Sequence, residues 1–426
     1  MKYLIPVENL PAFDFKKFKK LTPLIYEKTI RLSRKIKGKK VVHINSVSYG
    51  GGVAEMLRSQ IPLENSLGLN SLWYTLSAPL KFFNITKKIH NLLQGKKAKL
   101  SENEKKYYLN WISTKAGKDF CYILEKESPD ILIIHDPQPL PLISLLSKSK
   151  KQPRIILRLH LDLSTPEKNT LKFLKKFILR YNSVILSHPD YKFSWLDSNK
   201  VEIIYPAINP FSVKNRPMKL SQAKEILFTL GVHSDKPIIS QVSRFDPWKD
   251  PLGAIQSYYL AKREIPNLCL ILAGIFFATD DPEAKKIFKE VKKHTEGDPD
   301  IYLFSDPYQL KNVSNDLFIN AVYTISTVVL QKSIREGFGL TVTEAMWKKK
   351  PVIGGETKGI SLQITHNKNG FLVKTPYEAA DYIVKLFKDK KLRKRIGEYA
   401  HKTVKEKFLI SRLILDHLRI YRNVRC

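Results

Sequence analysis

The amino-acid sequence predicts an α/β protein with two doubly wound domains that face each other across a cleft. Three observations lead to this prediction. The chain has 426 residues, enough for two or three domains, and 43% of them are hydrophobic, which is ordinary for a folded protein. Short apolar runs alternate with stretches long enough for a helix. These runs form two series, and a polar segment with two prolines separates them.

The first series of apolar runs lies between residues 40 and 206. Continuous apolar runs, in contrast to strict alternation, are typical of strands covered on both faces, so we expect parallel strands joined by crossover helices. The expected strands are Lys40 to Asn45, Ser71 to Leu76, Asp130 to Asp136, Arg154 to His160, Ser183 to His188 and Val201 to Pro206.

The second series follows a linker at Asn209 to Leu220, where we place the domain boundary. We expect an N-terminal domain over residues 1–212 and a C-terminal domain over 213–405. Residues 406–426 form a final helix whose apolar face suits either domain, and packing back on the N-terminal domain is the expected arrangement. The strands of the second series are Pro237 to Phe245, Leu268 to Gly274, Ile301 to Ser305, Thr327 to Ser333, Lys350 to Gly355 and Gly370 to Val373.

Composition excludes several classes of protein. No apolar run approaches the roughly 18 residues that a membrane-spanning helix needs, so an integral membrane protein is not expected. The first residues lack the charged-then-apolar layout of a secretory signal. The cysteines, Cys121, Cys269 and Cys426, are few and widely spaced, and no residues have zinc-ligand spacing. We therefore expect a cytoplasmic protein without disulfides.

Positive charge is in large excess, because 73 Lys and Arg against 40 Asp and Glu give a net charge of +33. Much of the surplus lies in clusters at Lys16 to Lys20, Arg34 to Lys40 and Lys388 to Arg395. Aromatic residues are not interleaved with these clusters as on a base-stacking surface. Solvated faces are the favoured interpretation, weak association with an anionic surface is the alternative, and nucleic-acid binding has only the charge in its favour.

A glycine-rich turn follows the first expected strand, where Gly50, Gly51 and Gly52 precede a helix that begins near Val53. Glycines let the backbone approach a ligand closely, and the N–H groups at a helix start face that ligand. The spacing is neither that of a Walker loop nor that of a dinucleotide-binding fingerprint. An ordinary tight turn is an equally good interpretation of these glycines alone.

Two cations follow the first strand of the second series, Arg244 and Lys249 in SRFDPWKD. A departing nucleoside diphosphate gains negative charge as the bond to its sugar breaks, and fixed cations stabilise this charge more in the transition state than in the ground state. We expect the pair to act as metal-free catalysts of leaving-group departure. Taken alone, they would more often be an ordinary surface Arg and Lys.

Two glutamates, Glu336 and Glu344, flank seven residues after the strand Thr327 to Ser333. The first lies in a glycine-bearing loop, and the second about two turns into a helix that Thr341 or Thr343 would open. A loop Glu can bind sugar hydroxyls and a helix Glu can bind ribose hydroxyls, while the N–H groups at residues 339–341 face a diphosphate. A solvated helix face is the minor alternative.

Polar side chains also end two strands of the first series, where His160 and Asp136 would line a cleft. A lone histidine is as often a structural residue. Asp298 and Asp300 form an Asp-x-Asp pair, which elsewhere can bind a divalent metal; in this proline-containing loop an ordinary turn is favoured.

Together these residues resemble the retaining nucleotide-sugar glycosyltransferases of the GT-B architecture, which has two Rossmann-like domains. The element EGFGLTVTE with the upstream SRFDPWKD carries the match. Within this group the chain resembles the trehalose synthases that use a nucleotide sugar, and their trehalose phosphorylase relatives. The similarity covers about Val41 to Val373 and also rests on HINSVSYGGGVAEML, FFNITKKIHNLLQG, HDPQP, LHLDLS and DDPEA.

The resemblance implies a role for each candidate residue. Glu336 would hold the donor sugar, Glu344 the ribose, and Arg244 with Lys249 the diphosphate. His160 would contact the transferring glucosyl unit from the opposite domain. The remaining implied donor-binding residues are Gly51, Gly52, Gly337, Phe338, Gly339, Leu340 and Thr341, and Asp136 would bind the acceptor.

The resemblance further implies transfer of glucose from ADP-, UDP- or GDP-glucose to glucose with retention, without a metal, a cofactor or a covalent enzyme nucleophile. Two departures from relatives concern the ligands: Lys358 replaces a glycine near the phosphates, and Ser77 to Phe83 lacks a glycine before its FF pair. The alternatives are a trehalose phosphorylase and a basic, membrane-surface glycosyltransferase with a lipid acceptor. A homodimer is expected by resemblance alone.

Overall fold

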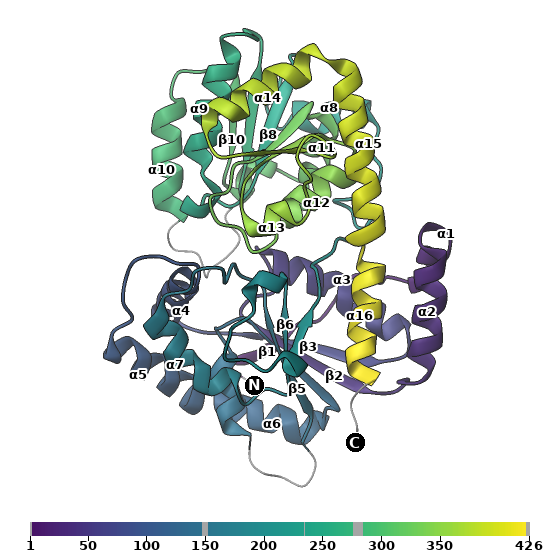
Figure 1. The fold of residues 1–426 in the computed structure, drawn as a ribbon, viewed down its shortest axis with the longest axis vertical. Coiled ribbons are helices and arrows are strands. Elements are labelled where there is room, and N and C mark those ends of the chain that lie inside the picture. Colours follow the sequence, from purple (N-terminus) through teal and green to yellow (C-terminus); the bar gives the residue numbers. More distant parts are fainter. Residues whose placement is uncertain (1, 147–151, 234, 276–283, 423–426) are drawn as a thin grey trace. The chain divides into compact units, whose positions relative to one another are not determined.

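The computed structural model describes residues 2–146, 152–233, 235–275 and 284–422, which form two compact units (Figure 1). Unit 1 runs from the N-terminus to Ala207 and resumes at Ile410, and unit 2 runs from Ile208 to Leu409. The boundary expected after residue 212 lies a few residues further along the chain. Two parts of the sequence discussed above lie outside the described residues. They are Cys426 and residues 280–283, the first four of the DDPEA run.

Unit 1 contains a sheet with the strand order β1-β3-β2-β4-β5-β6-β7. Every neighbouring pair is parallel except β1 with β3, which is antiparallel. The six strands expected from the apolar runs are confirmed, whereas the edge strand β1 is too short to give a periodic signal. The strands are β1 (Leu4–Pro6), β2 (Lys40–Asn45), β3 (Asn70–Leu76), β4 (Ile131–His135), β5 (Arg154–Leu159), β6 (Ser183–Leu186) and β7 (Val201–Ile203).

Helices cover both faces of this sheet. The larger apolar core lies between one face and helices that include α4 and α7. On the other face α3 contacts α16, which also packs against α2 (Figure 1). The helices are α1 (Phe18–Leu21), α2 (Pro23–Arg34), α3 (Gly52–Ser66), α4 (Leu80–Leu93), α5 (Glu102–Trp111), α6 (Gly117–Glu127), α7 (Lys168–Ile178) and α16 (Ile410–Arg422).

Side-chain alternation makes the two faces of the sheet chemically different. In β2, Val42 and Ile44 belong to the larger apolar core, and His43 between them points to the opposite face. His135 in β4 and Arg158 in β5 alternate with core residues in the same way. The face toward α3 and α16 therefore carries a buried polar layer.

Unit 2 contains a sheet with the order β10-β9-β8-β11-β12-β13, and all its neighbouring strands are parallel. The order reverses between β8 and β11, which is the switch point of a doubly wound sheet. All six strands expected in this half are confirmed. They are β8 (Ile238–Val242), β9 (Cys269–Ala273), β10 (Ile301–Phe304), β11 (Val328–Gln331), β12 (Val352–Gly355) and β13 (Phe371–Val373).

Helices also cover both faces of the second sheet. The apolar core between α9, α14 and one face includes Ile239, Leu270 and Leu272, while α8 and α11 pack together on the other face (Figure 1). None of the described helices is long and apolar enough to span a bilayer. The helices are α8 (Leu220–Thr229), α9 (Pro251–Lys262), α10 (Ala284–Thr295), α11 (Asn315–Ile325), α12 (Leu340–Trp347), α13 (Lys358–Ser361), α14 (Pro376–Lys388) and α15 (Lys390–Lys407).

Candidate active site

An ion pair joins the two loops that leave the central strands of unit 2. Lys249 follows β8 and Glu336 follows β11, and the Lys249 Nζ lies 2.5 Å from the Glu336 Oε2. Ser333 Oγ donates a second hydrogen bond to the same oxygen at 3.2 Å. Glu336 is buried, with 8% of its surface exposed. The structure thus brings together two predicted site residues from opposite sides of the switch point.

Hydrogen bonds between β8, β11 and their loops hold this pair in place. Gln241 at the end of β8 donates to the Lys249 carbonyl at 3.0 Å and accepts from the Lys332 backbone N–H at 3.0 Å. The backbone N–H of Ile334 donates to the Trp248 carbonyl at 2.9 Å. A single glutamine side chain therefore links both loops.

Gly339 turns the chain into α12 directly behind Glu336. Its φ is +86°, which favours glycine, and a Cβ at this position would lie 3.1 Å from Glu336 Cγ. The helix begins at Leu340 with Gly339 as its N-cap, so the expectation that Thr341 or Thr343 opens it is wrong. Glu344 lies four residues after Leu340, so it is little more than one turn into the helix and not about two turns as expected.

The loop at residues 336–338 packs tightly on α13. A Cβ on Gly359 would lie 2.5 Å from the Glu336 carbonyl oxygen and 2.6 Å from the Phe338 nitrogen, so only glycine fits there. The Gln363 amide donates to the Phe338 carbonyl at 2.5 Å and to the Gly339 carbonyl at 3.2 Å. These contacts orient the predicted donor-binding segment, which also includes Gly337, Leu340 and Thr341.

Only 1% of the surface of Glu344 is exposed, so this residue does not lie on a solvated helix face. Tyr323 OH donates to its Oε2 at 3.1 Å, and the Lys214 Nζ lies 3.4 Å from its Oε1. Both carboxylate oxygens therefore have protein partners in the structure. Any contact of Glu344 with a ribose stays a prediction.

Arg244 also lies just past β8, as expected from the sequence. Its guanidinium is 3.9 Å from the Asp246 carboxylate, and about one third of the side chain is exposed. Asp246 accepts a hydrogen bond from the Trp248 backbone N–H at 2.9 Å. Asp246 thus shapes the short turn between the two predicted cations.

In unit 1 the structure brings together Asp136 and His160, which follow neighbouring strands β4 and β5. The His160 backbone N–H donates to Asp136 Oδ1 at 2.7 Å. Asp136 has a φ of +64°, in the left-handed region that Asp tolerates better than most residues. The His160 ring stacks on His135, and burial, with the nearby Arg158 charge, lowers the pKa of His160 well below its usual range.

The glycine-rich turn precedes α3, which begins at Gly52 with Gly51 as its N-cap. Gly50 has a φ of +83°, and a Cβ on Gly51 would meet no heavy atom within 4 Å. The Arg58 guanidinium lies over the Tyr49 ring at 3.8 Å and so holds the turn against α3. The turn leaves open space beside Gly51.

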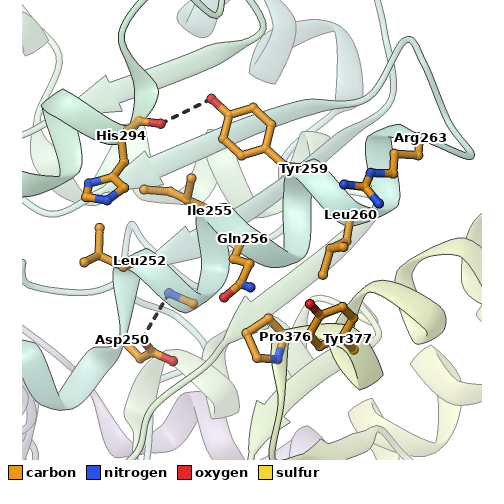
Figure 2. Close-up of a pocket in the computed structure, with 11 residues that line it drawn as sticks. Asp250, Leu252, Ile255, Gln256, Tyr259, Leu260, Arg263, His294, Pro376 and Tyr377 are labelled. Carbon is orange, nitrogen blue, oxygen red and sulfur yellow. Dashed lines mark hydrogen bonds between the residues drawn. The ribbon is translucent and has the colours of Figure 1, made fainter.

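A pocket of about 650 Å³ lies beside α9 in unit 2, where residues of α10 and α14 also line it (Figure 2). Tyr259 OH donates to the His294 carbonyl at 3.3 Å, and Asp250 accepts from the Gly253 backbone at 3.0 Å. None of the predicted site residues is among the described residues that line it, although Asp250 directly follows Lys249. The lining residues are Asp250, Leu252, Gly253, Ile255, Gln256, Tyr259, Leu260, Arg263, His294, Pro376 and Tyr377.

Asp298 and Asp300 bind a lysine of their own unit. The Lys262 Nζ lies 3.0 Å from Asp298 and 3.0 Å from Asp300. Within the described parts of the chain, no group of three or more His, Cys, Asp or Glu side chains is arranged to hold a metal ion. Transfer without a metal stays a prediction.

Several contacting residues were not singled out in the sequence. Ser333 and Gln241 support the Lys249–Glu336 pair, and Lys214 and Tyr323 contact Glu344. Ser333 and Gln241 are polar residues near the ends of apolar strands, and this pattern could have indicated a place near the site. Lys214 lies in the linker, where nothing in the local sequence distinguishes it.

A chain with two doubly wound units, whose sheets are parallel except for the edge strand β1, and with this Glu-bearing loop is a GT-B glycosyltransferase. Residues 43–193 match the family model "Trehalose synthase, N-terminal domain" and residues 222–403 match "Glycosyl transferases group 1". The chain is 39% identical over 393 residues to a trehalose synthase of Pyrococcus horikoshii, with 92% of each chain covered. The protein therefore belongs to the trehalose synthase family of group 1 glycosyltransferases and is a hexosyltransferase.

More distant relatives agree with this assignment. A trehalose phosphorylase of Pleurotus pulmonarius is 29% identical, over 88% of this chain and 56% of the relative. The solved structure of a UDP-forming α,α-trehalose-phosphate synthase from Burkholderia xenovorans has a TM-score of 0.70 at 15% identity, with 91% of this chain and 99% of that chain covered. At this identity the structural likeness concerns the fold, and the predicted GT-B fold class is confirmed.

Proposed function

We propose that this protein transfers the glucosyl group of a nucleoside-diphosphate glucose to free glucose and so forms α,α-trehalose. The observation that carries the proposal is the Lys249–Glu336 ion pair at the carboxyl ends of β8 and β11. In doubly wound sheets, ligands bind outside the strand ends at the switch point, and these are the two strands that flank it. The trehalose synthase relatives support the choice of product.

The proposed reaction keeps the anomeric configuration of glucose. The bond from the sugar C1 to the phosphate oxygen breaks through an oxocarbenium-like transition state, and the acceptor oxygen bonds to C1 on the same face. The acceptor proton passes to the departing diphosphate oxygen. Arg244 and Lys249 stabilise the charge that develops on the diphosphate, so neither a metal nor a covalent enzyme intermediate is needed.

The other predicted residues position the substrates in this proposal. Glu336 accepts hydrogen bonds from hydroxyls of the donor sugar, and His160 contacts the same glucosyl unit. Glu344 binds the ribose and Asp136 the acceptor. The backbone of the remaining donor-binding residues approaches the donor; these are Gly51, Gly52, Gly337, Phe338, Gly339, Leu340 and Thr341.

The experiment that tests this function offers the purified protein ADP-, UDP- or GDP-glucose with isotopically labelled glucose. The expected product is a nonreducing disaccharide that carries the label in one of its two rings, together with one nucleoside diphosphate per disaccharide. Absence of labelled disaccharide with all three donors would refute the proposed reaction. The comparison of donors also identifies the preferred base.

A phosphorolytic reaction is the second candidate, because the chain is also similar to a trehalose phosphorylase. In that case inorganic phosphate replaces the nucleoside diphosphate beside Lys249. The two functions are separated by supplying trehalose with phosphate in one sample and with nucleoside diphosphate in another. We expect glucose release only with the nucleoside diphosphate.

A further inference from the structure

A second pocket, with a volume of about 390 Å³, lies between α5 and α7 in unit 1, where these helices are neighbours (Figure 1). Two lysines of each helix line it, Lys105 and Lys106 from α5 and Lys172 and Lys176 from α7. They bring four positive charges to one small concave surface. None of the predicted site residues is among the described residues that line this pocket.

Carboxylates neutralise only part of this charge. Glu102, which also lines the pocket, pairs with Lys105 at 2.7 Å, and the hydrogen bond from Lys105 lowers the pKa of Glu102. Among the residues that the structure describes, no carboxylate forms an ion pair with Lys106, Lys172 or Lys176. The pocket therefore has a clear excess of positive charge.

Two other glutamates of these segments are engaged by other partners. Glu104 pairs with Lys88 at 2.8 Å and accepts from the Ser101 backbone N–H at 2.7 Å. Glu167 is the N-cap of α7 and accepts from two backbone N–H groups of that helix at 2.9 and 2.8 Å. Turning either carboxylate toward the pocket would leave N–H groups at a helix start unpaired. The excess charge is therefore a fixed property of the fold.

The ring of Phe173 holds two of the ammonium groups at the pocket. The Lys105 Nζ lies 5.5 Å from the centre of the ring and the Lys176 Nζ lies 5.6 Å from it, one from each helix. A cation is attracted to the face of an aromatic ring. Lys172 and Lys176 are about one turn apart on α7, so their like charges share a face and repel each other. The lysines are thus gathered at one place against their own repulsion.

Linked phosphate groups match this arrangement in charge and in shape. Each phosphate group presents several acceptor oxygens, and lysine ammonium groups bind phosphate through charge-assisted hydrogen bonds. Because the lysines come from two helices around the pocket, an anion must be extended to neutralise all of them. A lipid surface fits less well, because a helix that docks on a membrane presents apolar side chains outward. Here Leu109 and Phe173 are half-buried, whereas Lys172 and Lys176 are exposed.

We propose that the pocket between α5 and α7 binds an anion with two or more linked phosphate groups, such as a short inorganic polyphosphate or the phosphate chain of a free nucleotide. The four lysines hold the phosphate groups. The bound anion removes their mutual repulsion and so stabilises unit 1. The site does not depend on the proposed function, since Arg244 and Lys249, proposed to meet the donor diphosphate, belong to unit 2.

Calorimetric titration of the full-length protein with sodium tripolyphosphate tests the site, in about 150 mM salt, where the attraction of distant charges is screened. Lys172→Gln/Lys176→Gln removes two charges and keeps good helix formers, and we expect its affinity for tripolyphosphate to fall about tenfold or more. The matched control, Lys285→Gln/Lys289→Gln, removes two exposed lysines about one turn apart on α10 and should change the affinity less than about twofold. An equal loss in both would show attraction to the net charge of +33 and overturn the site.

The proposed donor site also attracts phosphate groups, so a third variant locates the bound anion. Lys249→Ala removes a cation of the donor site and should leave the binding that depends on Lys172 and Lys176 unchanged. Loss of all tripolyphosphate binding in Lys249→Ala would place the anion in unit 2 and overturn the proposal, whether or not trehalose is formed.

A comparison of anions identifies the part of the ligand that is recognised. Tripolyphosphate and a nucleoside triphosphate should bind with Kd values within about threefold of each other, because the phosphate chain carries the recognition. Binding of the nucleotide alone would overturn the assignment to linked phosphates. Binding to phosphatidylserine vesicles without binding of tripolyphosphate would overturn it as well and would indicate a membrane surface.

Discussion

The ammonium group of Lys249 lies 2.5 Å from the carboxylate of Glu336, although 87 residues separate them in the chain. The pair links the loops after β8 and β11, so the cation proposed to meet the diphosphate is fixed by the carboxylate proposed to hold the sugar. Fixed charges stabilise a transition state without the reorganisation that water requires. Under the proposed function, the pair therefore couples recognition of the diphosphate to recognition of the sugar.

Replacing either member of this pair should abolish most of the activity. We expect Lys249→Ala and Glu336→Ala each to lower kcat by about 100-fold or more, because a fixed charge at a developing anion or at the sugar is lost. Steady-state kinetics with the preferred donor measures this, and circular dichroism verifies the fold. The control is Lys224→Ala, which removes an exposed ion pair to Asp235 and should leave kcat unchanged. Full activity of either site variant would refute the assignment.

A substitution at Gly339 tests whether activity depends on the conformation of the loop that carries Glu336. Gly339→Ala forces alanine to a φ of +86° and places a methyl group 3.1 Å from Glu336 Cγ. Gly231→Ala is the matched control, because its φ is +92° and nothing lies within 4 Å of its Cβ. Both variants should lose about 1 kcal/mol of unfolding free energy. Only Gly339→Ala should lose activity, by about tenfold or more; equal activity of the two would contradict the proposed role.

The buried pair of Lys214 and Glu344 predicts a stability effect that differs from the effect on catalysis. Glu344→Met leaves the Lys214 ammonium without this carboxylate in a buried site and should cost about 3 kcal/mol of unfolding free energy. The double variant Lys214→Met/Glu344→Met should recover part of this loss. Denaturant unfolding measures both. If only the KM for the donor changes and stability does not, Glu344 binds ribose without a structural role.

Local patterns were sufficient for the strands but not for their order. Apolar runs report burial on both faces, so β2 to β13 could be predicted, whereas the three residues of β1 are too few to show a period. The order of the strands depends on contacts between distant segments of the chain. Only this order shows that Lys249 and Glu336 follow the two strands at the switch point. The start of α12 was missed because a glycine with positive φ, not a hydroxyl cap, opens it.

The same reasoning explains which parts of the candidate site were missed. His160 and Asp136 could be found because polar residues at the ends of apolar strands are unusual. His43 lies inside the apolar strand β2, where a single polar residue does not by itself indicate a functional site. Its partner Glu64 is 21 residues away on a helix, and Tyr421 is 357 residues from Glu64. Periodicity within one element carries no information about such distant partners.

The buried histidines of unit 1 make its stability depend on pH. Burial, with neighbouring positive groups, lowers the pKa of His135, His160 and His417 well below the ordinary value of 6.5. Below pH 6.5 the unfolded chain therefore binds protons that the folded chain does not, so stability is fully present above 6.5 and falls as the pH falls. For these three groups the loss between pH 6.5 and 5.5 is about 3 kcal/mol.

Denaturant unfolding at pH 7.5, 6.5 and 5.5 measures this dependence. His135→Leu should show about two thirds of it, because one of the three titrating groups is gone. The loss should begin well above the pH at which carboxylates titrate, since the charge appears on histidine in the unfolded chain. A free energy of unfolding that stays constant from pH 7.5 to 5.5 would show that these rings take up protons without unfolding.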